Sequence, residues 1–129
     1  MKKLLITSAA LVATMGLAFA AGEKPSAEHV QWMKDLGAQN GAIRKSVDVD
    51  KNATAMIADM KAVSKFWAGR TSDVAAKSTA NITAGAEMIL KAAGDAAGVQ
   101  AGMKMIGSGC KGCHDVHREK VSDTENLIK

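Results

Sequence analysis

The chain has 129 residues, enough for one domain of ordinary size. Its 17 basic and 13 acidic side chains give a formal charge of +4, and the lysines are scattered, which is typical of solvated helix faces and argues against a nucleic-acid partner. With no Tyr, two Phe, two Trp and one Pro beside abundant Ala, Met, Lys and Gly, the composition excludes a strand-rich fold and predicts an all-α one whose core is short of large side chains.

The first 20 residues have the pattern of a secretory signal peptide. Lys2 and Lys3 precede a mostly apolar stretch at 4–17, and Ala-Phe-Ala at 18–20 suits the cleaving peptidase. Because the stretch is too short to span a membrane, we expect cleavage at this point, no stable membrane insertion and a mature chain of 21–129 in the periplasm. Without Lys2 and Lys3, 15 basic side chains remain against 13 acidic ones, a formal charge of +2.

The first two helices are predicted from caps and periodicity. Ser26 is the expected N-cap of the first helix, and Glu28 in its first turn suits the positive end of the helix dipole. One face of this helix then follows at steps of three and four: His29, Met33, Leu36, Asn40, Ile43 and Val47. A polar stretch at 48–52 interrupts the pattern. The second helix is expected over about 53–68, with the inward stripe Met56, Met60, Val63 and Trp67.

The last two helices complete the expected fold. The third is predicted to begin at a cap on Ser72 or Asp73 and to end near residue 93, where Gly94 and Asp95 supply a stop and a new cap. Its apolar positions are Val74, Ile82 and Ile89. The fourth carries a stripe at helical spacing: Val99, Met103, Ile106, Cys110, Cys113 and His117. Four amphipathic helices with short connections predict an antiparallel four-helix bundle that holds its cofactor between facing helices.

The fourth helix carries the most informative motif, Cys110-Lys111-Gly112-Cys113-His114, which uses both cysteines of the chain. Cys-x-x-Cys-His is typical of c-type haem attachment. Two thiols one helical turn apart can form thioethers to both vinyl groups of a porphyrin, and the following imidazole can bind the iron. We therefore expect one covalent haem c on Cys110 and Cys113, with His114 as the proximal iron ligand. Export agrees, because c-type haem is attached on the far side of the bacterial inner membrane.

Other interpretations of the two cysteines are weaker. A thioredoxin-like redox pair calls for a βαβ pattern, and a structural disulfide does not call for the following His. A zinc site needs two more ligands, which His29 and His117 do not provide as a zinc-type pair. The sequence also has no serine nucleophile with a base, no convergent carboxylate pair and no phosphate-binding loop, so we expect no enzyme activity.

The arrangement resembles the cytochrome c′ family, the class II c-type cytochromes, over essentially all of 21–129. Members of that family are exported four-helix bundles whose haem motif lies on the fourth helix. The match is most specific at 110–118, where the family has Cys-x-x-Cys-His, two residues, an aromatic and a basic residue. Here His117 replaces the aromatic residue and Arg118 matches the basic one. The resemblance implies that Arg118 lies near the haem on the proximal side.

The second axial ligand separates two functions that the resemblance allows. In one branch of the family, a Met on the first helix binds the iron and gives a low-spin electron carrier. In the other branch the iron stays five-coordinate and binds NO or CO. Trp32-Met33-Lys34-Asp35 resembles the first-helix segment of the Met-ligated branch. The resemblance therefore implies Met33 as the distal ligand, and electron transfer to an unidentified periplasmic redox partner as the function. Some members of the family pair through their first two helices, so it implies a monomer or a homodimer.

Two observations complicate the assignment of Met33 as the distal ligand. A Met on an apolar helical stripe is commonly a core residue, so Met33 has a packing alternative. His29 lies one turn before Met33 on the same face, where the family often has an Arg that reaches a haem propionate. Either side chain can therefore approach the iron. The alternative for His29 is a partly exposed residue of the first turn.

Three glycines, Gly107, Gly109 and Gly112, surround the first cysteine. A glycine inside a helix costs about 1 kcal/mol relative to alanine. We expect their missing side chains to let the backbone approach the porphyrin; the alternative is simple tolerance of glycine beside a covalent cofactor. Next to them, His117 is expected to be a packed or surface residue beside the proximal face.

Overall fold

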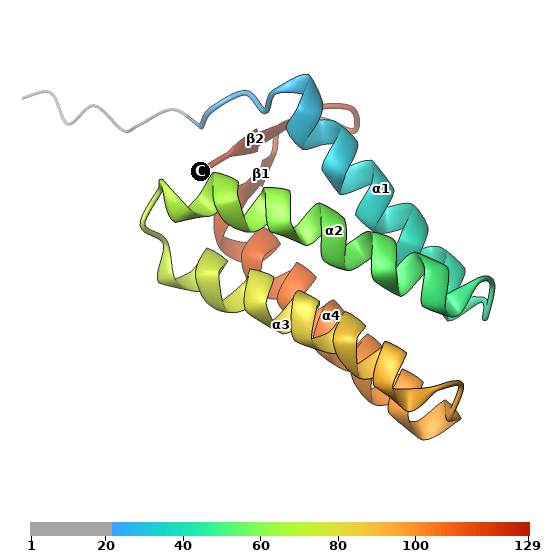
Figure 1. Cartoon of the computed structure of the whole chain (residues 1–129). Coiled ribbons are helices and arrows are strands. Elements are labelled where there is room, and N and C mark those ends of the chain that lie inside the picture. The colour runs from blue at the N-terminus through green and yellow to red at the C-terminus, as the bar shows by residue number, and fades with distance from the viewer. Residues whose placement is uncertain (1–21) are drawn as a thin grey trace, which may run out of the picture.

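The computed structural model describes residues 22–129, so the expected signal peptide at 1–20 lies outside the described residues. Over this range the chain forms four helices that pack into a bundle, followed by a short β-hairpin (Figure 1). The all-α bundle is thereby confirmed. Within the same range, no helix is both long enough and apolar enough to cross a membrane. The elements are α1 (Ala27–Arg44), α2 (Val49–Ala68), α3 (Asp73–Ala92), α4 (Ala96–His117), β1 (Arg118–Lys120) and β2 (Asn126–Ile128).

Three helices begin at side-chain caps that the sequence predicts. The caps are Ser26 for α1, Ser72 for α3 and Asp95 for α4. Each side-chain oxygen accepts the backbone N–H three residues further on, at 3.1, 3.1 and 2.9 Å. These bonds satisfy N–H groups that a helix start leaves without an intrahelical partner.

The start of α2 was predicted wrongly. The helix begins at Val49, about four residues earlier than expected, because the polar stretch 48–52 forms its first turn. Asp48 takes the left-handed conformation there, with φ 43° and ψ 48°. The Asn52 amide donates to the carbonyls of Val47 and Asp48 at 3.1 and 3.0 Å, which closes the turn. Val47 lies outside α1 and is 51% exposed, so it does not continue the inward stripe of that helix.

The closest helix pair is α3 and α4, which meet backbone to backbone through glycine. A Cβ added to Gly102 would lie 2.5 Å from the carbonyl oxygen of Gly85 and 2.6 Å from Cγ1 of Ile89. A Cβ added to Gly85 would in turn lie 2.6 Å from the carbonyl oxygen of Gly102. Real Cβ atoms do not come this close, so the approach of the two helices requires glycine at both positions.

The glycines near the first cysteine serve this same packing. A Cβ on Gly109 would lie 2.7 Å from the carbonyl oxygen of Ser78 and 2.6 Å from Cγ1 of Ile82, both on α3. A Cβ on Gly112 would lie 3.2 Å from Oγ of Ser78, whereas one on Gly107 would meet nothing within 4 Å. The expectation that all three admit a porphyrin is therefore wrong, because Gly109 and Gly112 face α3.

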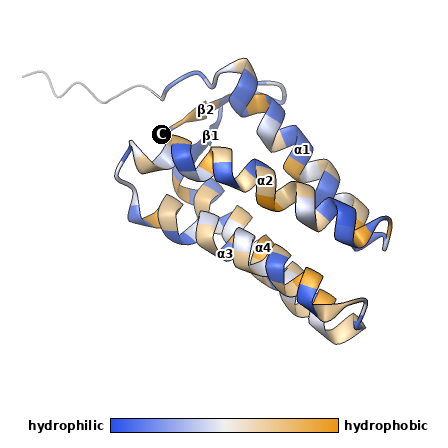
Figure 2. Ribbon diagram, in the orientation of Figure 1, coloured by the Kyte–Doolittle hydropathy of each residue, from blue (hydrophilic) through white to orange (hydrophobic). Residues whose placement is uncertain are grey.

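The centre of the core is the inward stripe of α2, as predicted. Met56, Met60, Val63 and Trp67 are all buried. Ile82 and Ile89 of α3 and Ile106 of α4 join them, whereas Val74, the first apolar position expected on α3, is exposed. Figure 2 shows many hydrophilic residues on α1, whose buried side chains are only His29, Leu36 and Ile43. The first helix therefore has a narrow inward face.

Each helix packs closely on the next helix along the chain. α1 packs on α2, α2 on α3 and α3 on α4, whereas α1 and α4 stand apart (Figure 1). A bundle with four closed contacts would bury the facing sides of α1 and α4 against each other. Here those two sides leave space between them.

The C-terminal hairpin was not predicted. β1 and β2 pair antiparallel, with Arg118 opposite Ile128. Glu23 extends the pairing, because its backbone exchanges hydrogen bonds of 2.6 and 2.7 Å with that of Ile128. In the turn, Ser122 Oγ accepts the backbone N–H of Glu125 at 3.1 Å. The hairpin joins the two ends of the described chain, and Ile128 is 7% exposed.

The glycine contact between α3 and α4 yields a matched pair of substitutions on one helix. Gly102→Ala should destabilise the protein by about 1–3 kcal/mol, because the added methyl overlaps the α3 backbone. Gly107→Ala should be neutral or stabilising by up to about 1 kcal/mol, because it fills open space and removes a helix glycine. Urea unfolding followed by circular dichroism measures both. Equal losses of stability in the two variants would contradict the packing described.

Candidate functional site

The residues of the Cys-x-x-Cys-His motif line a cavity between α1 and α4, near the hairpin end of the bundle. Its volume is about 550 Å³, within the range of about 300–1,000 Å³ that is usual for ligand sites. Cys110, Cys113 and His114 reach it from α4, and His29 and Met33 reach it from α1. We call this space the motif cavity.

The two cysteines lie one helical turn apart and are half-buried free thiols. Burial raises the pKa of the Cys110 thiol. Burial also raises the pKa of Cys113, and the neighbouring Cys110 raises it further. Both sulfurs are therefore protonated thiols at neutral pH, in contrast to the low-pKa thiolates of disulfide oxidoreductases.

His114 follows the second cysteine and is partly buried in the same wall. Its pKa is lowered, first by burial and then by the positive charges of Arg118 and His29. A neutral imidazole keeps one nitrogen lone pair free, which is the form that binds metals. The imidazoles of His114 from α4 and His29 from α1 both line the motif cavity.

The α1 side of the motif cavity holds a buried histidine. His29 is 8% exposed, so the expectation of a partly exposed first-turn residue is wrong. Its ring packs against Phe66 and Trp32, with centroid distances of 4.8 and 5.8 Å. Burial lowers its pKa, and the nearby charge of Arg70 lowers it further. Its Nδ1 atom is buried and has no hydrogen-bond partner among residues 22–129.

Met33 lies one turn beyond His29 and is partly buried. A second methionine, Met60 of α2, also lines the cavity, although periodicity assigned it to the core alone. Met60 is 1% exposed and enclosed by core side chains. Asn40, whose buried Oδ1 has no hydrogen-bond partner among residues 22–129, adds a polar group to the α1 wall. Its place on the predicted inward stripe was the available signal for this role.

Arg118 is the first residue of β1 and lines the motif cavity from its exposed rim. All five site residues expected from the sequence, Cys110, Cys113, His114, Met33 and Arg118, therefore line one cavity. The hairpin closes its end with Asn126, Leu127 and Ile128, a contribution that periodicity did not reveal because these residues follow the last helix.

His117 holds the end of α4 to its surroundings. Its Nδ1 lies 2.9 Å from the carbonyl oxygen of Lys129, and its Nε2 lies 2.6 Å from Oγ of Ser72. The carbonyl can only accept, so Nδ1 donates and Nε2 accepts the hydroxyl proton of Ser72. The ring also packs on Trp67, with a centroid distance of 4.4 Å. His117 thus joins α2, α3 and the C-terminus, beside the proximal His114.

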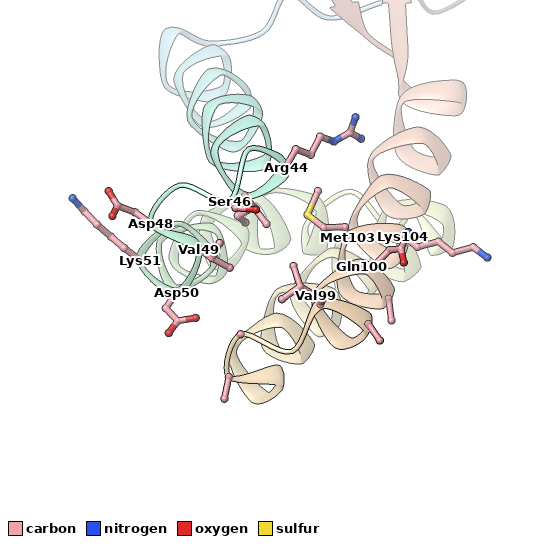
Figure 3. Close-up of a pocket in the computed structure, with 16 residues that line it drawn as sticks. Arg44, Ser46, Asp48, Val49, Asp50, Lys51, Val99, Gln100, Met103 and Lys104 are labelled. Atoms are coloured by element: carbon pink, nitrogen blue, oxygen red, sulfur yellow. The ribbon is translucent and has the colours of Figure 1, made fainter.

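A larger hollow, of about 1380 Å³, lies at the opposite end of the bundle (Figure 3). The connection between α1 and α2 forms one side, and the start of α4 forms the other. Val99 and Met103 line it, so the inward stripe of α4 is shared between two spaces. Its lining includes no Cys or His, and none of the expected site residues lies there.

Neither the metal-site geometry nor comparison with known proteins adds an assignment. Within residues 22–129, no group of three or more His, Cys, Asp or Glu side chains is arranged to hold a bare metal ion. Comparisons with protein-family models, with curated proteins and with solved structures found no match.

The hairpin closes the end of the motif cavity, and its packing there should also contribute to the stability of the protein. Ile128→Ala should destabilise the protein by about 2–4 kcal/mol, because it removes a buried side chain from the cavity end. Val121→Ala, at a 54% exposed position beside the same turn, is the matched control and should change stability by less than about 0.5 kcal/mol. Urea unfolding measures both, and equal effects would contradict a packed hairpin.

Proposed function

We propose that this chain carries one covalent haem c on Cys110 and Cys113 and transfers single electrons in the periplasm. The observation that supports this most is the convergence of Cys110, Cys113 and His114 on a cavity whose opposite wall holds Met33. The motif belongs to haem attachment in sequence, and its three reactive side chains line one space. A disulfide or an isolated redox pair would not require that space.

The cavity has the character of a cofactor site. Its walls are mostly apolar and carry a few polar groups, as in typical small-molecule pockets. The buried atoms Nδ1 of His29 and Oδ1 of Asn40 have no partners within 22–129, so the α1 wall offers polar contacts that a bound group can use. The residues present therefore fit a porphyrin with its iron.

The expected site residues of α4 and β1 have distinct tasks in this proposal. The thiols of Cys110 and Cys113 hold the cofactor covalently, and the neutral imidazole of His114 is the proximal ligand. Arg118 at the rim offers positive charge to an acidic substituent. Haem supplies the one-electron couple between Fe(II) and Fe(III), while the protein supplies ligands, burial and orientation.

Met33 is the proposed distal ligand. It comes from α1, the wall opposite the motif, where it lines the cavity and is only partly buried. Met60 is enclosed by core side chains and less available. A Met ligand raises the reduction potential of a His-ligated haem, which suits an electron carrier. The partner remains an unidentified periplasmic redox protein.

Covalent attachment can be tested by mass. The protein, expressed in a host that matures c-type cytochromes, should exceed the mass of its 21–129 polypeptide by one haem and stay coloured after denaturation. Cys110→Ala/Cys113→Ala should lose that haem, because no thioether can form. His117→Phe, next to the motif but outside it, is the control and should retain the haem. An unmutated chain with the bare polypeptide mass would refute the proposal.

Ligation can be tested by spectroscopy. The ferric protein should be six-coordinate and low-spin, with a weak far-red band from the thioether ligand. Met33→Leu should abolish this band, whereas Met60→Leu and Met103→Leu, in the core and at the other hollow, should leave it. A high-spin spectrum in the unmutated protein would instead support the five-coordinate alternative, a protein that binds NO or CO.

A further inference from the structure

We propose that His29 is a second distal donor, which binds the iron whenever Met33 does not. The inference rests on the proposed function, because it concerns the same cofactor. It deepens that function by giving the distal wall two donors in place of one. The two side chains are four residues apart on α1 and line the same cavity, so they share one helix face.

The position of His29 is held by packing. The ring is 8% exposed and lies in a cluster with Phe66 and Trp32. Phe66 in turn packs edge-on against Trp67, with a centroid distance of 5.3 Å, and the guanidinium of Arg70 lies 4.1 Å from its ring centroid. The imidazole is therefore part of an ordered aromatic group and not a mobile surface side chain.

The buried Nδ1 atom of His29 makes no hydrogen bond within the described chain. Nδ1 is without a partner, and a buried polar atom left in this state costs about 1–3 kcal/mol. Glu23, the acidic group that acts on the pKa of His29, is already engaged, because both of its carboxylate oxygens accept from Arg70, at 2.7 and 3.1 Å. The imidazole of His29 also lines the motif cavity, where a bound group can contact it.

The imidazoles of His29 and His114 also line the same motif cavity. One ring comes from α1 and the other from α4, on opposite walls of the same cavity. His114 would hold the iron, and His29 would approach it across the cavity that both rings line. Imidazole ligation lowers the potential relative to a thioether, so loss of Met33 from the iron would leave a low-spin, lower-potential haem in place of an open site.

The test uses three variants of the haem-loaded protein. Met33→Leu removes the thioether at similar volume. His29→Phe keeps an aromatic ring against Phe66 and Trp32 but removes the nitrogen donors. The third variant combines both substitutions. The readouts are electron paramagnetic resonance of the ferric protein, the far-red band, the midpoint potential and CO binding to the ferrous protein.

The expected results separate the two donors. Met33→Leu should lose the far-red band yet stay low-spin, with a lower potential than the unmutated protein. His29→Phe should keep the band. The double variant should become high-spin and bind CO at least tenfold more tightly than Met33→Leu. Added imidazole should return the double variant to the low-spin state, which shows that its pocket is intact.

Failure of this inference differs from failure of the proposed function. If Met33→Leu is already high-spin and binds CO as tightly as the double variant, His29 is not a donor, although the Met-ligated carrier stands. If the unmutated protein is low-spin without the far-red band and His29→Phe is high-spin, His29 is the resident ligand and the assignment of Met33 is wrong. If no covalent haem is present, the proposed function itself falls.

Discussion

The close contact between α3 and α4 is the constraint on which the rest of the structure depends. Gly85 and Gly102 allow the two backbones to touch, and Gly109 continues the contact along α4. Because successive residues of a helix are about 100° apart, Cys110 and His114 lie about 100° and 140° around α4 from Gly109. The face that packs on α3 therefore turns Cys110 and His114 away from α3, whereas Cys113, about 40° from Gly109, lies at the border of that face.

The space between α1 and α4 exists because α1 is held at only one side. It packs on α2 but stands apart from α4, and its inward face is narrow. The motif cavity occupies the region where a fourth helix–helix contact would otherwise form. In the proposed function the cofactor supplies that missing packing, which agrees with a chain that has one Phe and two Trp after residue 20. Cofactor binding and bundle stability are then coupled, since whatever fills the cavity joins α1 to α4.

The sequence predicted features that depend on local chemistry. Helix caps at Ser26, Ser72 and Asp95 are short-range hydrogen bonds, and the α2 stripe is a period in the chain, so both could be predicted. The early start of α2 was missed because the turn at Asp48 needs a left-handed residue that polarity alone does not indicate. Two tertiary contacts could also not be predicted from local sequence. Gly109 packs on α3, and the hairpin residue Ile128 closes the cavity. Cys110, Cys113 and His114 were expected from the motif, and Met33 and Arg118 from the family resemblance, whereas the burial of His29 depended on Phe66 from another helix.

His117 and His29 have different roles because their surroundings differ. His117 uses both ring nitrogens, toward Ser72 and the Lys129 carbonyl, and therefore has no lone pair to offer. Its position is structural, at the junction of three elements. His29 is equally packed among aromatic rings, but its buried Nδ1 has no partner within the described chain. A ring that is held in place while one nitrogen makes no hydrogen bond is preorganised for a ligand. The conformational entropy of ordering that ring is already lost on folding. The same fold thus gives His117 a structural role and leaves His29 available to bind a ligand.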